Sequence, residues 1–510
     1  MNVREPTVID NALFYVLTLL VIAGFTAFVS HWIVNGLLKL IRHIFIIDYS
    51  RKHLFLEHLS KTVTAPVVVG FFHPYCDAGG GGERVLWVAV ESTLKSFNTG
   101  VVVYTGDEAS SNDILDRAEL RFNVTLDRSR IELVFLRKRY LVSAERWPRF
   151  TLLGQSLGST VLGYEAISNL PPDIFVDTMG YAFTYPLVHW LLNVPIFAYV
   201  HYPTISTDML GALNPGLSPY KWIKSLYWRW FSWLYTFVGS YPELVVANSS
   251  WTHAHITQLW WTGHKTNHID ILYPPCFQAE PDLHLARTER PPHLVAVGQF
   301  RPEKRHEVLI SEYAKFLQKG TTEGEKSKLI LIGSVRPDSS DAANVERLKS
   351  MTKELSISKQ VQFVLDAPWS EVQSQLSNAT AGLNAMWNEH FGIVLVEYMT
   401  LGAIPIAHAS GGPLQDIIVP YEGKPTGFHF ATKEDKNSAD YDTLADVIER
   451  VFSMPQEERQ QMRLRAMKSV SRFSETEFEK AWNLRIDLLL KMHEIRKQKL
   501  EAQGYLSSGE

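Results

Sequence analysis

Short apolar runs alternate with helical segments along most of this 510-residue chain, and this alternation constrains the fold more than any other feature. The runs are rich in β-branched and aromatic residues and contain few polar ones. Near-continuously apolar strands are typical of parallel sheets that are buried on both faces. The predicted strands are 67–72, 101–104, 131–135, 174–176, 196–200 and 244–247, then 294–297, 329–332, 361–365, 381–385 and 404–407.

Helical segments such as 83–95 and 112–119 separate these runs, so the sequence predicts an α/β fold with two Rossmann-like, doubly wound domains. Prolines between residues 274 and 292 interrupt the pattern and indicate a linker. The two domains are expected to face each other across a cleft, with ligands at the carboxyl ends of the strands. The predicted boundaries are 64–275 for the first domain, 276–292 for the linker, 293–470 for the second domain, and 471–510 for a C-terminal helix and tail. That helix is expected to be mostly solvated, although Leu488, Leu489, Leu490 and Met492 could dock it.

The charge balance and the cysteine content exclude several classes of function. The chain has 50 basic and 54 acidic residues, so it lacks the overall positive charge of a nucleic-acid-binding protein. It has only two cysteines, Cys76 and Cys276, which argues against a disulfide-built secreted protein and against a cysteine-ligated zinc site. Both are expected to be reduced thiols.

Residues 12–34 contain no Asp, Glu, Lys or Arg, and this run exceeds the roughly 20 helical residues that cross a hydrocarbon core. A cleaved signal peptide would have a shorter apolar region and a basic start, whereas Arg4 is offset here by Glu5 and Asp10. Residues 1–50 are therefore predicted to be an uncleaved single-pass anchor with a basic flank. Because lysines and arginines follow the span, the positive-inside rule places the downstream domains in the cytosol.

Glu389 and Glu397 are separated by seven residues within the stretch NEHFGIVLVEYMTLGAIPIAHASGGP, residues 388–413. A loop after the strand at 381–385 is predicted to open into a helix at Ile393, with Glu397 about one turn inside it on the side of the loop. Unpaired N–H groups at a helix start favour anions such as phosphate. The two carboxylates could then hold sugar hydroxyls beside that phosphate. A capped amphipathic helix with two solvated acids is the alternative interpretation.

A four-glycine loop follows the first predicted strand and opens a helix. Glycines let a backbone approach a ligand closely, and the helix start favours phosphate or a polar sugar. The spacing fits neither the G-x-G-x-x-G nor the Walker pattern. A flexible surface loop is the alternative. The four residues are Gly79, Gly80, Gly81 and Gly82.

Two further strand ends carry candidate site residues. His201 ends the strand at 196–200 and is expected to point into the cleft, although a lone histidine is as often structural. Gly298, Arg301 and Lys304 follow the first strand of the second domain. The two cations there could neutralise a diphosphate, since Arg offers planar donors and Lys a mobile charge; an exposed basic turn is the alternative.

The only D-x-D pattern is Asp440-Tyr441-Asp442, which lies in a polar segment and does not end an apolar strand. A catalytic Mg²⁺ or Mn²⁺ site is therefore not expected. A different segment, 220–241, combines four tryptophans and four tyrosines with Lys221, Lys224 and Arg229. This composition favours a helix that lies in a membrane surface, and an aromatic core helix is the alternative.

Residues 66–492 resemble the retaining, GT-B-fold glycosyltransferases of family four. The stretches that carry the resemblance are FFHPYCDAGGGGERVLW, FAYVHYPTISTDM and the 388–413 sequence. Within the family, they are most similar to the mannosyltransferases of dolichol-linked oligosaccharide assembly. The resemblance implies GDP-mannose as donor, no metal cofactor, and alpha-1,2 transfer of the fourth and fifth mannoses to a dolichol-linked trimannosyl acceptor. It implies the cytosolic face of the endoplasmic reticulum membrane, and it leaves room for other early-pathway mannosyltransferases as partners.

The resemblance also implies roles for individual residues. Glu389 would contact the donor sugar and Glu397 the ribose hydroxyls, while Lys304 would bind the diphosphate. The arginine that the family places directly after the strand glycine is Gln299 here, so Arg301 would substitute for it. The remaining matches are His201 near the donor sugar, the backbone of Phe391, Gly392 and Ile393 at the sugar and phosphates, and the loop from Gly79 beside the diphosphate and acceptor.

Two alternatives remain open at this point. A transferase of the same fold could use another nucleotide sugar. A catalytically silent, membrane-tethered scaffold for such enzymes would belong to a different class, although the presence of Glu389, Glu397 and Lys304 argues against it.

Overall fold

The computed structural model of this chain describes residues 47–211, 219–260, 269–277, 286, 288–336, 339–435 and 438–502. The predicted membrane span at 12–34 lies outside these residues. Among the helices that are described, none combines the length and the apolar character needed to cross a bilayer.

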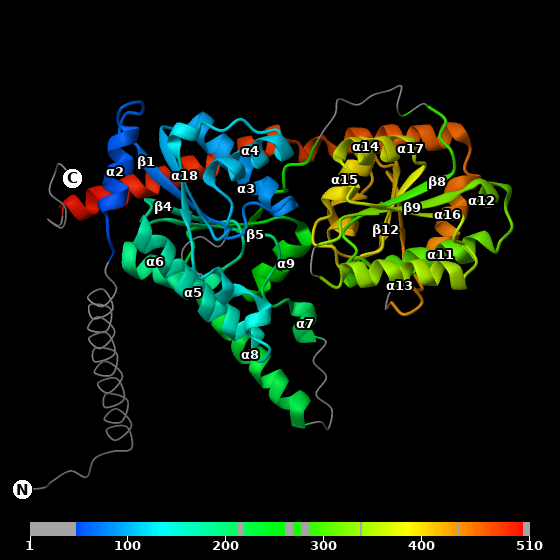
Figure 1. Cartoon of the computed structure of the whole chain (residues 1–510), viewed down its shortest axis with the longest axis horizontal. Helices are drawn as coiled ribbons and strands as arrows, with labels where there is room; N and C mark the ends of the chain where they lie inside the picture. Colours follow the sequence, from blue (N-terminus) through cyan, green and yellow to red (C-terminus); the bar gives the residue numbers. More distant parts are fainter. Residues whose placement is uncertain are drawn as a thin grey trace, which may run out of the picture.

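The described strands form two separate sheets, and every strand pair in both is parallel, as predicted (Figure 1). The first sheet has the order β3-β2-β1-β4-β5-β6-β7 and the second has the order β10-β9-β8-β11-β12-β13. The bounds are β1 Val67–Phe72, β2 Thr99–Thr105, β3 Ile131–Phe135, β4 Ile174–Asp177, β5 Ile196–Val200, β6 Leu244–Ala247, β7 Ile269–Ile271, β8 His293–Val297, β9 Lys328–Gly333, β10 Val361–Leu365, β11 Ala381–Asn384, β12 Ile404–His408 and β13 Phe428–Phe430.

The strand order reverses between β1 and β4 in the first sheet and between β8 and β11 in the second. In a doubly wound sheet the ligand crevice lies outside the carboxyl ends of the strands at such a reversal. The topology therefore predicts that a ligand binds among the loops after β1, β4, β8 and β11. The short edge strands β7 and β13 were not predicted, because three residues carry too little periodicity to separate a strand from a loop.

Helices cover both faces of each sheet (Figure 1). Alternate residues of β1 explain this layering, because Val69 and Phe71 enter one core and Val68 and Phe72 enter the other. The principal helices are α2 Ser50–Leu59, α3 Gly81–Ser96, α4 Ser111–Phe122, α5 Thr151–Asn169, α6 Tyr185–Leu192, α7 Thr207–Gly211, α8 Pro219–Val238, α9 Ser250–Leu259, α11 His306–Leu317, α12 Thr322–Lys326, α13 Asp341–Glu354, α14 Trp369–Asn378, α15 Ile393–Thr400, α16 Leu444–Ser453, α17 Gln456–Ser469 and α18 Glu475–Ala502.

The C-terminal helix α18 returns to the first domain and forms part of its core (Figure 1). The docking expected near its end is confirmed, because Leu489 is buried and Leu490 and Met492 pack against the same core, but the buried stripe begins earlier than predicted. Phe478, Trp482, Ile486 and Leu489 recur at intervals of three or four residues, so they share the face that is buried against the first sheet. The Trp482 ring lies 5.0 Å from that of Phe197, and its indole N–H donates to Thr93. The high content of charged residues on the other faces of α18 hides this apolar stripe in the sequence.

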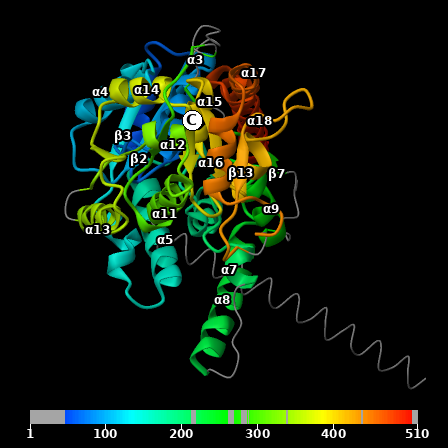
Figure 2. The same ribbon diagram turned by 90° about the vertical axis from the view of Figure 1, so that its right-hand side faces the viewer.

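α8 projects from the first domain in two perpendicular views (Figures 1 and 2). One face is buried through Phe231 and Tyr235, as in a core helix. The opposite face exposes large apolar side chains, each between 43% and 75% accessible: Tyr220, Trp222, Ile223, Leu226, Trp230, Trp233 and Phe237. The helix is thus amphipathic, and its role at a membrane surface stays a prediction.

Both cysteines are buried and unpaired, which confirms the expectation of reduced thiols. Cys76 lies in the loop after β1. Cys276 lies in the connection between the domains, where its backbone bridges to Ser474 at the start of α18. The chain therefore passes between the domains twice at nearly the same place.

Candidate active site

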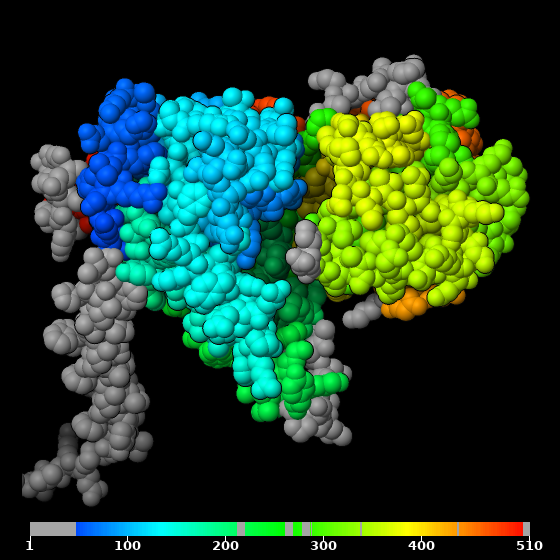
Figure 3. All heavy atoms as spheres, viewed as in Figure 1, coloured from blue at the N-terminus to red at the C-terminus, as the bar shows by residue number. Residues whose placement is uncertain are grey.

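A cleft separates the two domains, and the carboxyl ends of both sheets face it (Figures 1 and 3). The structure brings the glycine loop of the first domain against the start of α15 in the second. A Cβ atom built on Gly81 would lie only 2.5 Å from Cδ1 of Ile393. Real Cβ atoms do not approach other atoms so closely, so a larger residue at position 81 would make the Ile393 side chain shift.

Lys304 and Glu389 form an ion pair at the floor of the cleft, with 2.7 Å between Nζ and Oε2. Lys304 belongs to the turn after β8 and Glu389 to the loop after β11, so each follows a strand that flanks the reversal in the second sheet. Asn384, the last residue of β11, donates from its side-chain amide to the same carboxylate oxygen at 3.3 Å. Burial opposes ionisation of Glu389, but the charge of Lys304 and the bonds from Lys304 and Asn384 outweigh it and lower its pKa. The carboxylate is therefore held charged beside a cation.

Glycines shape the loop that carries Glu389. Gly392 caps α15 with φ of +106°, in the left-handed region that L side chains rarely adopt. Gly412 donates its N–H to the carbonyl oxygen of Glu389 at 2.8 Å, and a Cβ on Gly411 would lie 2.3 Å from that oxygen. The Gly-Gly-Pro turn after β12 thus supports the loop from behind.

The side chain of Phe391 is buried against Tyr273 and Phe473, with ring centroids 5.7 and 5.2 Å apart. This packing leaves the backbone of Phe391, and not its ring, as a candidate ligand contact. Before them, the ring of His390 stacks on Tyr202 at 5.1 Å and lies 4.9 Å from Trp251, both from the first domain. Sequence reasoning missed this aromatic contact, because it joins segments far apart in the chain.

Glu397 lies on the second turn of α15 and is partly buried, away from the ion pair. Burial raises its pKa to about 7, and the charge of Arg84 partly opposes the shift. Arg84 itself donates to the carbonyl of Pro275 and pairs with Glu475 at the start of α18. This arginine was not predicted as a site residue, although it directly follows the glycine loop and Glu83.

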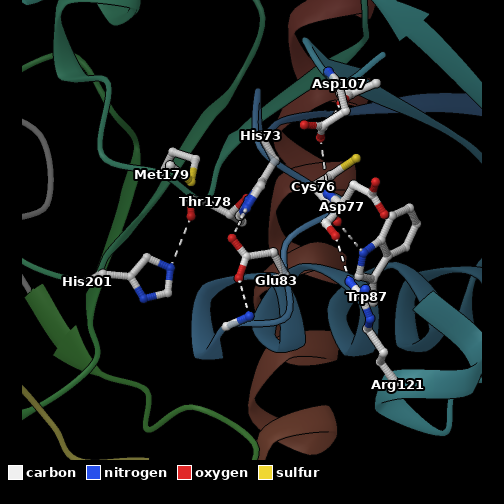
Figure 4. Close-up of polar contacts among 12 residues, drawn as sticks. His73, Cys76, Asp77, Glu83, Trp87, Asp107, Arg121, Thr178, Met179 and His201 are labelled. Atoms are coloured by element: carbon white, nitrogen blue, oxygen red, sulfur yellow. Dashed lines mark hydrogen bonds and ion pairs between the residues drawn. The ribbon is translucent and has the colours of Figure 1, made fainter. Parts of the chain in front are cut away.

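The glycine loop is held by buried polar groups after β1 (Figure 4). Glu83 accepts the N–H of Gly80 at 2.8 Å and lies 3.7 Å from His73 Nε2. His73 is fully buried, and its Nδ1 contacts the hydroxyl of Thr178 at 2.7 Å. Although burial opposes it, His73 and the backbone bonds lower the pKa of Glu83. The loop is thus anchored at Gly80 through Glu83 and His73.

His201 directly follows β5, as predicted, and its ring faces the first turn of α3 (Figure 4). Its Nε2 lies 3.0 Å from the carbonyl oxygen of Thr178, and Gly82 is adjacent. Burial, with a contribution from His73, lowers the pKa of His201 to about 4. The ring is therefore neutral at physiological pH. Because a carbonyl can only accept, Nε2 carries the proton and Nδ1 is an unprotonated acceptor.

The two cations of the basic turn after β8, Arg301 and Lys304, lie near different carboxylates. Lys304 points to Glu389, whereas Arg301 lies 3.8 Å from Glu303 and is about one-third exposed. A Cβ on Gly298 would lie 3.7 Å from the Lys304 side chain, an ordinary van der Waals distance, so Gly298 adjoins that lysine. The structure gathers Gly298, Lys304 and Glu389, and it leaves Arg301 at the rim.

Polar contacts between the domains line the same cleft and were not predicted. Asn388 donates to Asp208 of α7 at 2.7 Å. Asp416, behind the Gly-Gly-Pro turn, accepts the N–H of Ser250 at 2.9 Å and the hydroxyl of Tyr273 at 2.9 Å. Each joins residues more than a hundred positions apart, so no local pattern could have revealed them.

Within the described ranges, no group of three or more His, Cys, Asp or Glu side chains is placed to hold a metal ion. Asp442 pairs instead with Arg450 of α16. Two facing α/β domains, with a charged pair and a glycine loop on opposite walls of their cleft, define a GT-B glycosyltransferase.

Comparison with known proteins specifies the family. Residues 66–260 match the family model described as ALG11 mannosyltransferase N-terminus, and residues 284–469 match that described as Glycosyl transferases group 1. A Mus musculus protein named GDP-Man:Man(3)GlcNAc(2)-PP-Dol alpha-1,2-mannosyltransferase is 45% identical over 84% of this chain and 89% of its own length. The protein of that name from Homo sapiens is 45% identical over 86% of this chain and 90% of its own length. The one from Yarrowia lipolytica is 42% identical over 84% of this chain and 77% of its own length. The chain belongs to this family of alpha-1,2-mannosyltransferases.

Solved structures support the fold. Alpha,alpha-trehalose 6-phosphate synthase from Burkholderia multivorans is 12% identical, with a TM-score of 0.60 over 84% of this chain and 100% of that one. Sucrose-phosphate synthase from Thermosynechococcus elongatus is 18% identical, with a TM-score of 0.55, and the match covers 86% of this chain and 100% of that one. At these identities the likeness concerns the fold alone.

Proposed function

We propose that this chain transfers mannose from GDP-mannose to a dolichol-diphosphate-linked trimannosyl oligosaccharide and forms alpha-1,2 linkages. It adds the fourth and fifth mannoses of the glycan precursor on the cytosolic face of the endoplasmic reticulum. Membership of the family carries this proposal, because relatives of the same printed function are 42–45% identical over most of the chain. The Lys304–Glu389 pair in the cleft supports a catalytic protein over a silent scaffold.

The donor lies across the floor of the cleft in this proposal. Glu389 binds the mannose hydroxyls, Lys304 and Arg301 bind the diphosphate, and Glu397 binds the ribose. The backbone N–H groups at the start of α15 and along the glycine loop add neutral donors to the phosphates. His201 presents an unprotonated Nδ1 on the first-domain side, where it accepts a hydrogen bond from a sugar hydroxyl.

Transfer breaks the bond between the anomeric carbon and the β-phosphate oxygen and forms a bond to the acceptor hydroxyl oxygen. The acceptor attacks on the face from which the diphosphate leaves, so the alpha configuration is retained. A phosphate oxygen of GDP takes the hydroxyl proton. Lys304 and the helix starts stabilise the charge that grows on the leaving diphosphate. This arrangement needs neither a protein nucleophile nor a metal ion.

The protein works at a membrane in this proposal, because its acceptor is lipid-linked. The predicted single-pass anchor at 1–50 attaches the chain to the membrane. The exposed aromatic face of α8 supplies a second contact in the first domain, with Lys221, Lys224 and Arg229 facing anionic headgroups. The tyrosine and tryptophan rings suit the interfacial layer of a bilayer.

A transfer assay tests the function directly. The full-length protein, GDP-mannose and a lipid-linked trimannosyl acceptor should give products with one and two added mannoses. GDP should compete with the donor much more strongly than UDP. Absence of transfer with an intact fold would support the scaffold alternative, and stronger competition by UDP would support another nucleotide sugar.

A further inference from the structure

A cavity of about 1180 Å³ opens at the β3 edge of the first sheet, beside the carboxyl ends of β2 and β3. None of the proposed donor-binding residues lines it. Ligand pockets for drug-sized molecules measure roughly 300–1,000 Å³. This cavity therefore has room for several linked sugar rings, and the donor-site roles leave it without a function.

Charged side chains line the cavity in balanced numbers. Arg139 forms an ion pair with Asp107, and Glu165 accepts the backbone N–H groups of Arg137 and Lys138, each at 3.0 Å. The lining arginines 51, 137 and 139 are matched by acids at 107, 108 and 165. A lining without excess charge suits a neutral ligand that both donates and accepts hydrogen bonds. Carboxylates accept from hydroxyl groups and guanidinium groups donate to them, so a polyol meets both kinds of partner.

Aromatic rings complete the lining. Tyr140 is 58% exposed and Phe135 is 41% exposed, although both are large apolar side chains. The ring of Tyr75 lies at the inner end, where the guanidinium carbon of Arg139 is 4.8 Å from its centroid. Rings offer flat apolar surfaces beside a few polar groups, which suits the C–H faces and hydroxyl edges of a sugar.

The cavity adjoins the donor cleft through the loop after β1. Asp107, on the cavity wall, accepts the N–H of Asp77 at 3.1 Å, and Asp77 is two residues from the first loop glycine (Figure 4). Tyr75 of the cavity lining also belongs to the connection after β1 that carries the glycine loop. The cavity and the loop therefore lie at the same edge of the first sheet, the edge that faces the cleft.

We infer that this cavity binds the oligosaccharide part of the acceptor and positions its terminal mannose in the cleft. The inference rests on the proposed function, because it assigns a subsite to that reaction. Tyr140 and Phe135 pack on sugar rings, and the Arg139–Asp107 pair bonds hydroxyl groups. Because the volume exceeds that of a monosaccharide, the cavity accommodates the glycan both before and after the first added mannose.

Steady-state kinetics of full-length Tyr140→Ala and Phe135→Ala test this subsite. Each variant should raise KM for the lipid-linked acceptor at least fivefold, with KM for GDP-mannose and kcat at saturating acceptor within twofold of wild type. Trp369→Ala on α14 is the matched control, because Trp369 is also an aromatic side chain with 41% exposure and lies outside the cavity. An unchanged acceptor KM in both folded variants would overturn the inference.

Calorimetry separates the glycan from the diphosphate of the acceptor. The free trimannosyl chitobiose oligosaccharide should bind the wild-type protein and bind Tyr140→Ala at least fivefold more weakly, whereas inorganic pyrophosphate should bind both alike. Selective loss of pyrophosphate binding would overturn the glycan assignment. If wild-type protein binds this oligosaccharide but does not transfer mannose, the proposed function fails and the subsite stands.

Discussion

Lys304 Nζ lies 2.7 Å from Glu389 Oε2, and the two residues come from loops after different strands of the second sheet. The strands, β8 and β11, flank the reversal of strand order, so the fold itself brings the loops together. In the proposed mechanism, an arriving diphosphate would replace Glu389 as the anionic partner of Lys304. The proposal therefore links sugar binding by Glu389 to phosphate binding by Lys304.

Removing the carboxylate of Glu389 should strongly reduce transfer without unfolding the protein. Glu389→Gln keeps the size of the side chain and loses the charge, so transfer should fall by about 10²- to 10³-fold, the usual effect of losing one well-placed electrostatic group. Transfer assays and a thermal melt would measure the two effects. Glu346→Gln on exposed α13 is the matched control and should retain wild-type activity. Near-normal transfer by Glu389→Gln would contradict the assigned role.

Lys304→Ala should weaken GDP binding at least tenfold and change guanosine binding little, because only GDP carries the diphosphate. Equilibrium titration of both ligands would show the difference. Lys315→Ala, at a 57% exposed lysine on α11, serves as the control. Equal weakening of GDP and guanosine would mean that Lys304 supports the fold of the site instead of binding phosphate.

Gly81→Ala should reduce transfer modestly, because the new Cβ would lie 2.5 Å from Cδ1 of Ile393 and make that side chain shift at the start of α15. Gly81→Ala combined with Ile393→Ala should recover part of the loss, since the shorter side chain removes the clash. At Gly79 the nearest atom to an added Cβ is 3.9 Å away, so Gly79→Ala should cost less. Equal losses in the single and double variants would show that the clash is not the cause.

The stability of the ligand-free protein should depend on Glu397 between about pH 4.5 and 7. Burial raises the pKa of this carboxyl from 4.5 to about 7, so the folded state binds more protons than the unfolded state in that window. The free energy of unfolding therefore falls as the pH rises through the window, and the loss is complete above it. The Tm advantage of Glu397→Gln over wild type should be larger at pH 8 than at pH 5. Glu371→Gln, on the surface of α14, is the control for loss of a glutamate charge outside the site.

Membrane contact by α8 can be measured in the full-length protein in vesicles. An environment-sensitive dye on Trp222→Cys should report an apolar surrounding, and the same dye on Leu120→Cys, an 86% exposed site on α4, should report water. Labelling is selective because Cys76 and Cys276 are buried. An aqueous signal at position 222 would contradict the assignment of this face to the bilayer.

Local patterns were sufficient for the strands and for the positions that end them. The apolar runs predicted eleven of the strands to within a residue or two, since buried parallel strands need apolar residues on both faces. The same alternation placed Glu389, Lys304, His201 and the glycine loop at carboxyl ends. For α18 it indicated docking only near residues 488–492 and not at Phe478, Trp482 and Ile486, because charged residues dominate the composition of that helix.

The sequence by itself determined the two-domain architecture and the kinds of residue at the strand ends, because hydrophobic periodicity and glycine spacing are local properties. Only the tertiary structure decided which of them meet. It paired Lys304 with Glu389, set Arg301 at the rim, and placed Arg84 near Glu397. It also formed the cavity beside β3 from segments that are distant in the chain. The physical reason is that strand order and domain packing, which no local pattern encodes, control contacts between distant loops.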